Sequence, residues 1–259
     1  MRTFVKAVIY IVLIGYLVWK YAIPFFNSYQ IEDETVKLYS SLSSDPVPWQ
    51  VFRTSTDGNS IYMADFGDSA ETTLIFGAFH GDEQGGFNLV VELARFLRKN
   101  PSAINKRAVL VPVLNPDGLL AGTRTNSNKV DVNRNFPTKN WSPAYKNDRN
   151  HPGSEPASEA ETITAIELIQ KYRPTKIISI HAALHVVNYD GPGLGLAKEI
   201  ARYNKYDVSG DIGYATPGSF GTYAGKELNI PTITLELPSY NPQQAWLDNK
   251  DALIRAINF

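Results

Sequence analysis

The stretch Thr72-Thr-Leu-Ile-Phe-Gly-Ala-Phe79 runs directly into His80-Gly-Asp-Glu83, and this junction decides the fold. A run of aliphatic and aromatic side chains of this length predicts a buried strand. A histidine and a carboxylate three residues apart, where the strand gives way to a loop, can turn toward one point. Imidazole and carboxylate are ligands of catalytic zinc, which usually takes three protein ligands and keeps a fourth position for water.

Similar apolar runs recur along the chain and alternate with amphipathic segments. We expect further strands at Ala108–Leu114, Lys176–Ile180 and Thr232–Leu237. The predicted helices are Gly86–Lys99, Ser158–Tyr172, Leu194–Asn204 and Pro242–Ile257. This alternation predicts an α/β layered domain with a largely parallel sheet. In such sheets ligands bind beyond the carboxyl ends of the strands.

Composition and charge limit the classes of function that this chain can have. The chain has 259 residues, 43% of them hydrophobic and 20% charged, which is ample for a globular core. Its net charge of −1 lacks the broad basic footprint of a nucleic-acid-binding protein, so no nucleic-acid partner is expected. It contains no cysteine, so any metal must be held by His, Asp or Glu.

The N-terminus has the character of an export segment. Arg2 and Lys6 precede an apolar stretch that extends to residue 26 with Lys20 as its interruption. Basic residues before such a stretch favour a cytoplasmic N-terminus with the remainder across the membrane. We therefore predict a signal-anchor helix at residues 1–26, a connector at 27–50 and a catalytic domain at 51–259. A cleaved signal peptide and a buried core helix are the alternatives.

Two further residues stand where a metal hydrolase would use them. His181 follows the predicted strand Lys176–Ile180 and can complete a three-ligand zinc site with His80 and Glu83. Glu236 lies inside an apolar strand, where a carboxylate is costly to bury unless it is compensated. Glu236 is either an outward-facing residue on an edge strand or a general base that takes a proton from zinc-bound water.

The long irregular segment 115–157 carries several arginines and asparagines. Arg134, with Asn133 beside it, offers a planar fork of donors that can bind a carboxylate. Arg124, if it lies near the metal, can stabilise the oxyanion of a tetrahedral intermediate. Taken singly, each arginine is better explained as a solvated loop residue.

Together these motifs resemble a known family. His80-Gly-Asp-Glu83, Asn115-Pro-Asp-Gly118, Asp131-Val-Asn-Arg-Asn-Phe-Pro137, His181 and Thr234-Leu-Glu236 occur in the order found in the zinc metallocarboxypeptidases related to carboxypeptidase A. The resemblance covers about residues 50 to 257. Within the family, the segments 153–159 and 213–223 are similar to the bacterial murein peptide amidases. The resemblance implies a three-layer α/β/α fold with a mixed, largely parallel central sheet.

The resemblance also implies roles for individual residues. One zinc ion per chain would be held by His80, Glu83 and His181. The other implied roles are the general base, Glu236; the carbonyl and oxyanion stabiliser, Arg124; the clamp on the substrate's terminal carboxylate, Asn133 and Arg134; the mobile capping residue, Tyr214; and the carboxylate that orients the first zinc histidine, Asp131.

The implied reaction removes meso-diaminopimelate from murein peptides by cutting its bond to γ-D-glutamate. We expect a monomer anchored in the inner membrane with its catalytic domain in the periplasm, or one secreted there after signal cleavage. Known members of the branch can be cytoplasmic recyclers without an export segment, and residues 1–26 depart from that pattern. The alternatives are a general peptide metallocarboxypeptidase, a deacylase of the aspartoacylase type and an inactive cell-wall-binding protein.

Overall fold

The computed structural model describes residues 12–22, 34–238 and 241–259. The chain divides into two compact units, Met1–Ser41 and Leu42–Phe259. In the first unit, residues 12–17 are α-helical, η1 (Val18–Ala22) continues as a π-helix, and residues 34–41 form another helix. The predicted anchor at 1–26 lies largely outside the described residues. Within the described ranges, no helix has both the length and the apolar character that a membrane crossing requires.

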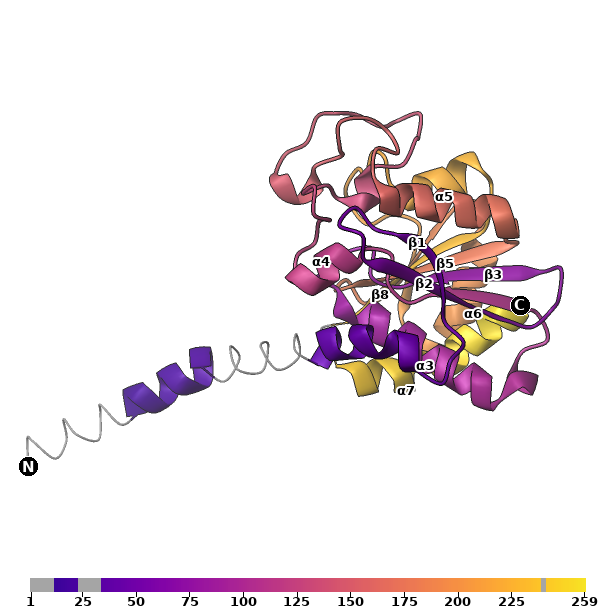
Figure 1. The fold of residues 1–259 in the computed structure, drawn as a ribbon, viewed down its shortest axis with the longest axis horizontal. Helices are drawn as coiled ribbons and strands as arrows, with labels where there is room; N and C mark the ends of the chain where they lie inside the picture. Colours follow the sequence, from indigo (N-terminus) through magenta and orange to yellow (C-terminus); the bar gives the residue numbers. More distant parts are fainter. Residues whose placement is uncertain (1–11, 23–33, 239–240) are drawn as a thin grey trace, which may run out of the picture. The chain divides into compact units, whose positions relative to one another are not determined.

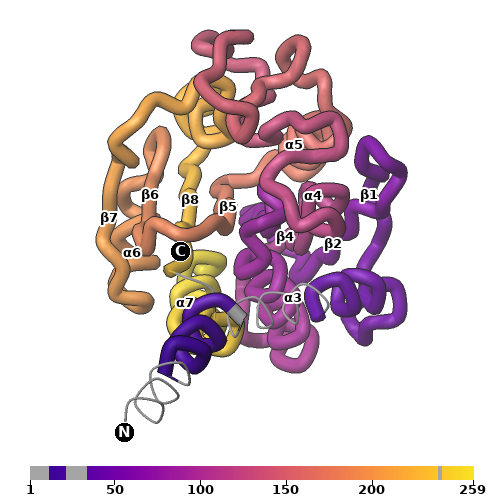
Figure 2. The backbone as a smooth tube through the Cα atoms, turned by 90° about the vertical axis from the view of Figure 1, so that its left-hand side faces the viewer, coloured from indigo at the N-terminus to yellow at the C-terminus, as the bar shows by residue number. Residues whose placement is uncertain are grey.

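The second unit is built on an eight-stranded sheet in the order β1-β2-β4-β3-β5-β8-β6-β7. The strands are β1 (Gln50–Thr54), β2 (Ser60–Phe66), β3 (Thr72–Phe76), β4 (Arg107–Val111), β5 (Lys176–Ala182), β6 (Val186–Asp190), β7 (Asp207–Ser209) and β8 (Thr232–Leu237). Neighbours are parallel from β4 through β3 and β5 to β8, and antiparallel at β1-β2, β2-β4 and β8-β6. Figure 2 shows most of this order across the molecule, from β7 to β1. The prediction of a mixed, largely parallel sheet is confirmed.

Helices cover both faces of the sheet (Figure 1). The α-helices are α3 (Gln84–Lys99), α4 (Pro116–Ala121), α5 (Ala160–Tyr172), α6 (Leu194–Asn204) and α7 (Pro242–Asn258). The shorter helices are η2 (Leu42–Ser44), η3 (Pro101–Ala103), η4 (Val132–Arg134), η5 (Asp148–Asn150) and η6 (Gly221–Glu227).

Strand alternation divides the core into two layers. On β3, Ile75 packs into one cluster with apolar residues of α3, α6 and α7. Its neighbours Leu74 and Phe76 pack into a second cluster with residues of α5 and η6. Successive side chains of a strand point to opposite faces, so β3, β4 and β5 each contribute to both clusters. This arrangement gives the expected three-layer α/β/α fold.

Candidate active site

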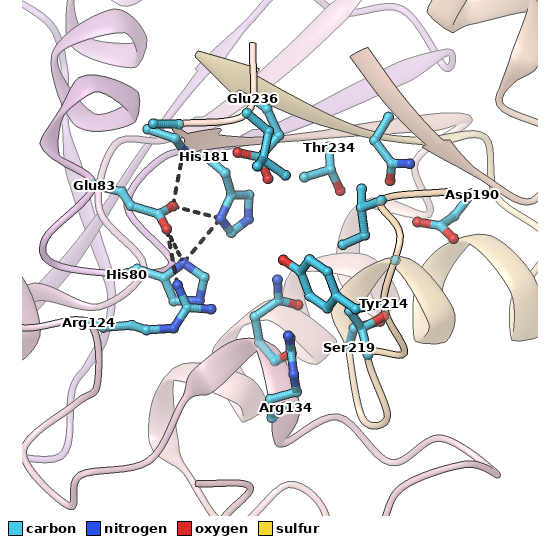
Figure 3. Close-up of a pocket in the computed structure, with 18 residues that line it drawn as sticks. His80, Glu83, Arg124, Arg134, His181, Asp190, Tyr214, Ser219, Thr234 and Glu236 are labelled. Carbon is cyan, nitrogen blue, oxygen red and sulfur yellow. Dashed lines mark hydrogen bonds and ion pairs between the residues drawn. The ribbon is translucent and has the colours of Figure 1, made fainter. Parts of the chain in front are cut away.

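Three metal-ligating side chains converge at the carboxyl ends of β3 and β5 (Figure 3). His80 follows β3, Glu83 stands at the start of α3, and His181 lies in β5. Each of the three offers one ligand atom within 4.8 Å of the others. His80 Nδ1 lies 2.8 Å from Glu83 Oε1, and His181 Nδ1 lies 2.9 Å from Glu83 Oε2. The three residues predicted as metal ligands are therefore brought together.

Close backbone packing holds the loop that carries His80 and Glu83. A Cβ added at Gly81 would lie 1.9 Å from the carbonyl carbon of Gly118 in α4. A Cβ at Gly77 would lie 2.5 Å from the carbonyl oxygen of Pro112. Only glycine permits these approaches, because any side chain would overlap main-chain atoms. The motif thus needs glycine at position 81 to bring the histidine and the carboxylate to the same point.

Asp131 lies behind the first histidine. Its Oδ1 is 3.1 Å from His80 Nε2, and its Oδ2 accepts hydrogen bonds from Arg124 Nε at 3.1 Å and Nη2 at 3.0 Å. Burial lowers the pKa of His80, but Glu83 and Asp131 outweigh it and raise that pKa to about 9. Burial raises the pKa of Asp131, but His80 and Arg124 hold it well below its usual range. Asp131 therefore stays ionised and fixes the orientation of the His80 ring.

The donor set fits a zinc ion. The Nδ1 atoms of His80 and His181 face each other at 3.2 Å, with the Glu83 carboxylate in contact with both. Two imidazole nitrogens and a carboxylate directed at one point match the three protein ligands of a catalytic zinc. His80 also has the carboxylate partner on its other nitrogen that zinc-bound histidines generally have.

Glu236 lies across from the ligands, in the middle of the sheet. It pairs in register with His181, and its strand β8 runs between β5 and β6. An outward-facing position on an edge strand is therefore wrong for this residue. Its Oε2 atom is buried and has no hydrogen-bond partner among the described residues. Burial raises the pKa of Glu236, and the nearby His181 offsets only part of this effect.

Asn133 and Arg134 line another side of the same cavity, which has a volume of about 150 Å³. Asn133 Oδ1 accepts a hydrogen bond from the Phe220 backbone at 2.8 Å, which leaves the side-chain amide free to donate. Arg134 is buried, and its Nη1 donates to the Asn133 carbonyl at 2.7 Å. Both side chains therefore present donors to an anionic group.

Arg124 and Tyr214 complete the predicted set. In addition to Asp131, Arg124 contacts Glu83, with Nη1 3.2 Å from Oε1. Tyr214 is 58% exposed, and Figure 3 shows its ring directed into the cavity. All eight predicted site residues line this one cavity.

Sequence reasoning missed several residues of the cavity wall. They are Asn188, Asp190, Ile212, Thr216, Ser219 and Thr234. Of these, Asp190 carried the clearest signal, because it is an acid at the end of a short apolar run, directly before Gly191-Pro192-Gly193. Its link to the site depends on the pairing of β6 with β8.

A model of the zinc carboxypeptidase family matches residues 35–192. The chain belongs to the zinc carboxypeptidase family. The family resemblance predicted from the motifs is thereby confirmed, and the chain is an enzyme of the zinc hydrolase class. Zinc, the metal of this family, is the cofactor that fits His80, Glu83 and His181.

Two relatives of this zinc carboxypeptidase are bacterial murein peptide amidases. Murein peptide amidase A of Vibrio campbellii is 34% identical over 198 residues, which cover 72% of this chain and 77% of the relative. Murein peptide amidase A of Escherichia coli K12 is 34% identical over 188 residues, 68% of this chain and 75% of the relative.

Solved structures agree with the fold. The murein-tripeptide amidase MpaA from Escherichia coli O157 superposes with a TM-score of 0.71 at 30% identity, covering 83% of this chain and 93% of the other. Carboxypeptidase A from Helicoverpa armigera has a TM-score of 0.68 at 19% identity, covering 88% of this chain and 71% of the other, and shows the shared fold alone.

Proposed function

We propose that this zinc carboxypeptidase is a murein peptide amidase that releases meso-diaminopimelate by hydrolysing its bond to γ-D-glutamate. The observation that carries the proposal is its similarity to murein peptide amidase A, which extends over 72% of this chain at 34% identity. The cavity supports it, because it joins a metal-ligand set to donors for a terminal carboxylate.

His80, Glu83 and His181 would hold the zinc ion, which would supply the Lewis-acid chemistry needed to polarise the scissile carbonyl and acidify water. Glu236 accepts a proton from the attacking water and delivers it to the leaving amine. The raised pKa of Glu236 suits a group that must take up and then release a proton. The lack of a hydrogen-bond partner on its Oε2 atom, among the described residues, leaves that atom available for the transfer.

Arg124 donates a hydrogen bond to the carbonyl oxygen as negative charge develops on it. In the structure its guanidinium is held by Asp131 and Glu83, and burial is outweighed by these two acids so that its pKa is raised. A cation positioned in advance needs little reorganisation during the reaction. Asp131 positions both Arg124 and His80, which makes it a positioning residue.

Asn133 and Arg134 bind the carboxylate of the substrate's last residue. Arg134 supplies charge-assisted hydrogen bonds and Asn133 supplies the free amide donors. Tyr214 folds over the bound residue and limits the access of water. This clamp restricts cleavage to the terminal bond, because a substrate without a free terminal carboxylate leaves Arg134 unpaired.

The proposed site of action is the periplasm, with residues 1–26 as an inner-membrane anchor. Support comes from Arg2 and Lys6 before the apolar stretch. Cell fractionation combined with a reporter fused after residue 50 tests this location. A membrane-bound reporter active in the periplasm is expected, whereas a reporter active in the cytoplasm contradicts the proposal.

The activity itself is tested with the full chain loaded with zinc. L-Ala-γ-D-Glu-meso-diaminopimelate should release free diaminopimelate, and α-linked peptides ending in Phe or Lys should be cleaved more slowly. Equal or faster cleavage of the α-linked peptides would identify a general peptide metallocarboxypeptidase instead.

A further inference from the structure

Beside the catalytic cavity lies an exposed arginine, Arg149, which takes no part in the chemistry described above. Arg149 belongs to the short helix η5, and two residues of the site hold the backbone of this segment. The Arg149 carbonyl accepts a hydrogen bond from Arg124 Nε at 3.2 Å, and the His151 carbonyl accepts one from the Asp131 backbone at 2.8 Å. These contacts fix η5 relative to the proposed oxyanion stabiliser.

The side chain of Arg149 reaches the loop that carries two of the metal ligands. Its Nη2 donates to Asp82 Oδ2 at 2.8 Å, and Asp82 stands between His80 and Glu83 in the sequence. Within the described part of the chain, Arg149 Nε and Nη1 donate no hydrogen bond. Because an arginine offers five N–H groups in a planar fork, Asp82 orients this guanidinium and still leaves donors for a second carboxylate.

The ion pair between Arg149 and Asp82 does not prevent Arg149 from binding a further anion. The side chain of Arg149 is 67% exposed and that of Asp82 is 27% exposed. Ion pairs of this exposure contribute little to stability, so the guanidinium can share its donors with a substrate or turn toward it at small cost.

Arg149 lies on the side of the cavity that suits the acyl part of a substrate. In the proposed function the last residue of the substrate extends from the scissile bond toward Arg134. Figure 3 shows Arg124 on the side of the metal ligands, and Arg134 in another part of the cavity. A scissile carbonyl bound at the metal ligands and Arg124 leaves the side of Arg149 for the acyl chain.

The acyl residue of the proposed substrate carries a negative charge close to the scissile bond. In γ-linked D-glutamate the scissile carbonyl comes from the side-chain carboxyl group, so the α-carboxylate stays free and is separated from that carbonyl by three carbons. An arginine fork can bind such a carboxylate through two charge-assisted hydrogen bonds. Lys146 is another exposed cation nearby, but it lines a neighbouring cavity of about 290 Å³ together with Arg134 and Tyr214, on the side of the last residue.

We propose that Arg149 determines specificity on the acyl side by binding the free α-carboxylate of the γ-linked glutamate. The inference rests on the proposed function, and it names the residue that recognises the acyl residue of that substrate. A peptide whose α-carboxylate has been converted to a carboxamide has the same shape but presents no negative charge to Arg149. The enzyme should therefore cleave the amidated peptide more slowly than the acidic one.

The test measures kcat/KM of the full zinc-loaded chain for L-Ala-γ-D-Glu-meso-diaminopimelate and for the same peptide with the α-carboxylate amidated. The wild type should cleave the acidic peptide about 10-fold faster, the lower end for a hydrogen bond to a charged group, because the guanidinium is exposed. In Arg149→Met this ratio should fall toward one, mainly through KM. Raising the ionic strength should shrink the wild-type ratio. A wild-type ratio near one overturns the proposal, as does an equal loss on both peptides in Arg149→Met.

Arg53→Met is the matched control, because it removes another exposed arginine in an ion pair, with Glu167 at 2.7 Å, and should leave the ratio unchanged. Arg149→Met keeps the backbone carbonyl that Arg124 contacts. If this variant does not fold, Arg149→Gln gives the same comparison. A ratio that falls in Lys146→Met and not in the Arg149 variants would overturn the assignment to Arg149.

The α-linked peptides Ala-Glu-Phe and Ala-Gln-Phe separate this proposal from the murein substrate. The side-chain carboxylate of α-linked glutamate is also separated from the scissile carbonyl by three carbons. Failure to cleave both γ-linked peptides, with cleavage of the α-linked ones, rejects the murein substrate. The ratio of Ala-Glu-Phe to Ala-Gln-Phe in wild type and Arg149→Met still tests Arg149 in that case.

Discussion

Asp131 Oδ1 lies 3.1 Å from His80 Nε2, on the side of the ring away from the other metal ligands. This contact fixes which nitrogen of His80 is presented to the metal, because the Nδ1 atom then faces Glu83 and His181. The same carboxylate holds Arg124. One buried acid therefore holds both His80, a candidate metal ligand, and Arg124, the proposed oxyanion stabiliser.

Replacing Asp131 with Asn should weaken zinc binding about 10- to 100-fold, because the imidazole loses its ionised partner while the side-chain shape is kept. Competition with a chromophoric zinc chelator measures the affinity directly. Asp68→Asn, an exposed substitution on the surface, serves as the control and should bind zinc like the wild type. Unchanged affinity in Asp131→Asn would show that the contact does not orient the ligand.

Replacing Arg134 with Met should raise KM and lower kcat/KM by a factor of about 10 to 100, because a buried charged donor to the substrate carboxylate is lost. A peptide with an amidated C-terminus should be a poor substrate for both proteins, and to a similar degree. Arg202→Met on the exposed face of α6 is the control. If Arg134→Met cleaved the free peptide as well as the wild type does, the carboxylate clamp would have to lie elsewhere.

Replacing Gly81 with Ala should destabilise the fold by about 1–3 kcal/mol, because the new Cβ would lie 1.9 Å from the main-chain carbonyl carbon of Gly118. Metal binding should weaken with it, since His80 and Glu83 flank this position. Gly195→Ala in α6 has only the tip of Phe259 within 4 Å, at 3.6 Å, and should be neutral or slightly stabilising. Urea unfolding of both variants gives the comparison, and equal stability of the two would rule out the close approach at Gly81.

Replacing Lys176 with Met should stabilise the protein at pH 7. Burial lowers the pKa of this lysine to about 8, helped by Lys106 and opposed by Glu71. The folded state then binds fewer protons than the unfolded state between about pH 8 and 10.5, so wild-type stability should rise with pH across this window. Below pH 8 the wild type bears the full free-energy cost of keeping Lys176 charged in its buried position. Replacement by Met should therefore raise the free energy of unfolding by about 1 kcal/mol. This gain is smaller than the pKa shift alone implies, because solvent screens part of the charge.

The free energies of unfolding of Lys176→Met and wild type, measured from pH 6 to 10, test the predicted direction of this pH dependence. The stability difference should shrink as the pH rises above 8. Lys198→Met, on the exposed surface of α6, should show no such trend. A difference that grows with pH would mean that Lys176 is stabilised in its charged form.

The sequence predicted the centre of the fold well. Buried strands read as continuous apolar runs, and β8 and α6 have the predicted bounds. β3 ends at Phe76, three residues earlier than predicted, and Ala78, two residues beyond this end, has a positive φ of 43°. The strands β1, β2, β6 and β7, which lie toward the two edges of the sheet, were not predicted, since their sequences mix polar and apolar residues.

The residues of the site likewise divide into those that the sequence predicted and those that it did not. His80, Glu83 and His181 were predictable because metal ligands need particular residue types at strand ends. Asp190 was not, because its place in the cavity depends on the antiparallel pairing of β6 with β8 and on the glycines of η6. Contacts that arise from strand register and close backbone packing leave little trace in local sequence patterns.

The central claim is that Glu236 carries the proton in a zinc hydrolase, and kcat of Glu236→Gln tests it most directly. Glutamine keeps the size of the side chain but cannot accept the proton, so kcat should fall about 10²- to 10⁴-fold while the zinc content, measured on the same sample, stays at one per chain. An enzyme that keeps both its zinc and its wild-type kcat after this substitution would contradict the account.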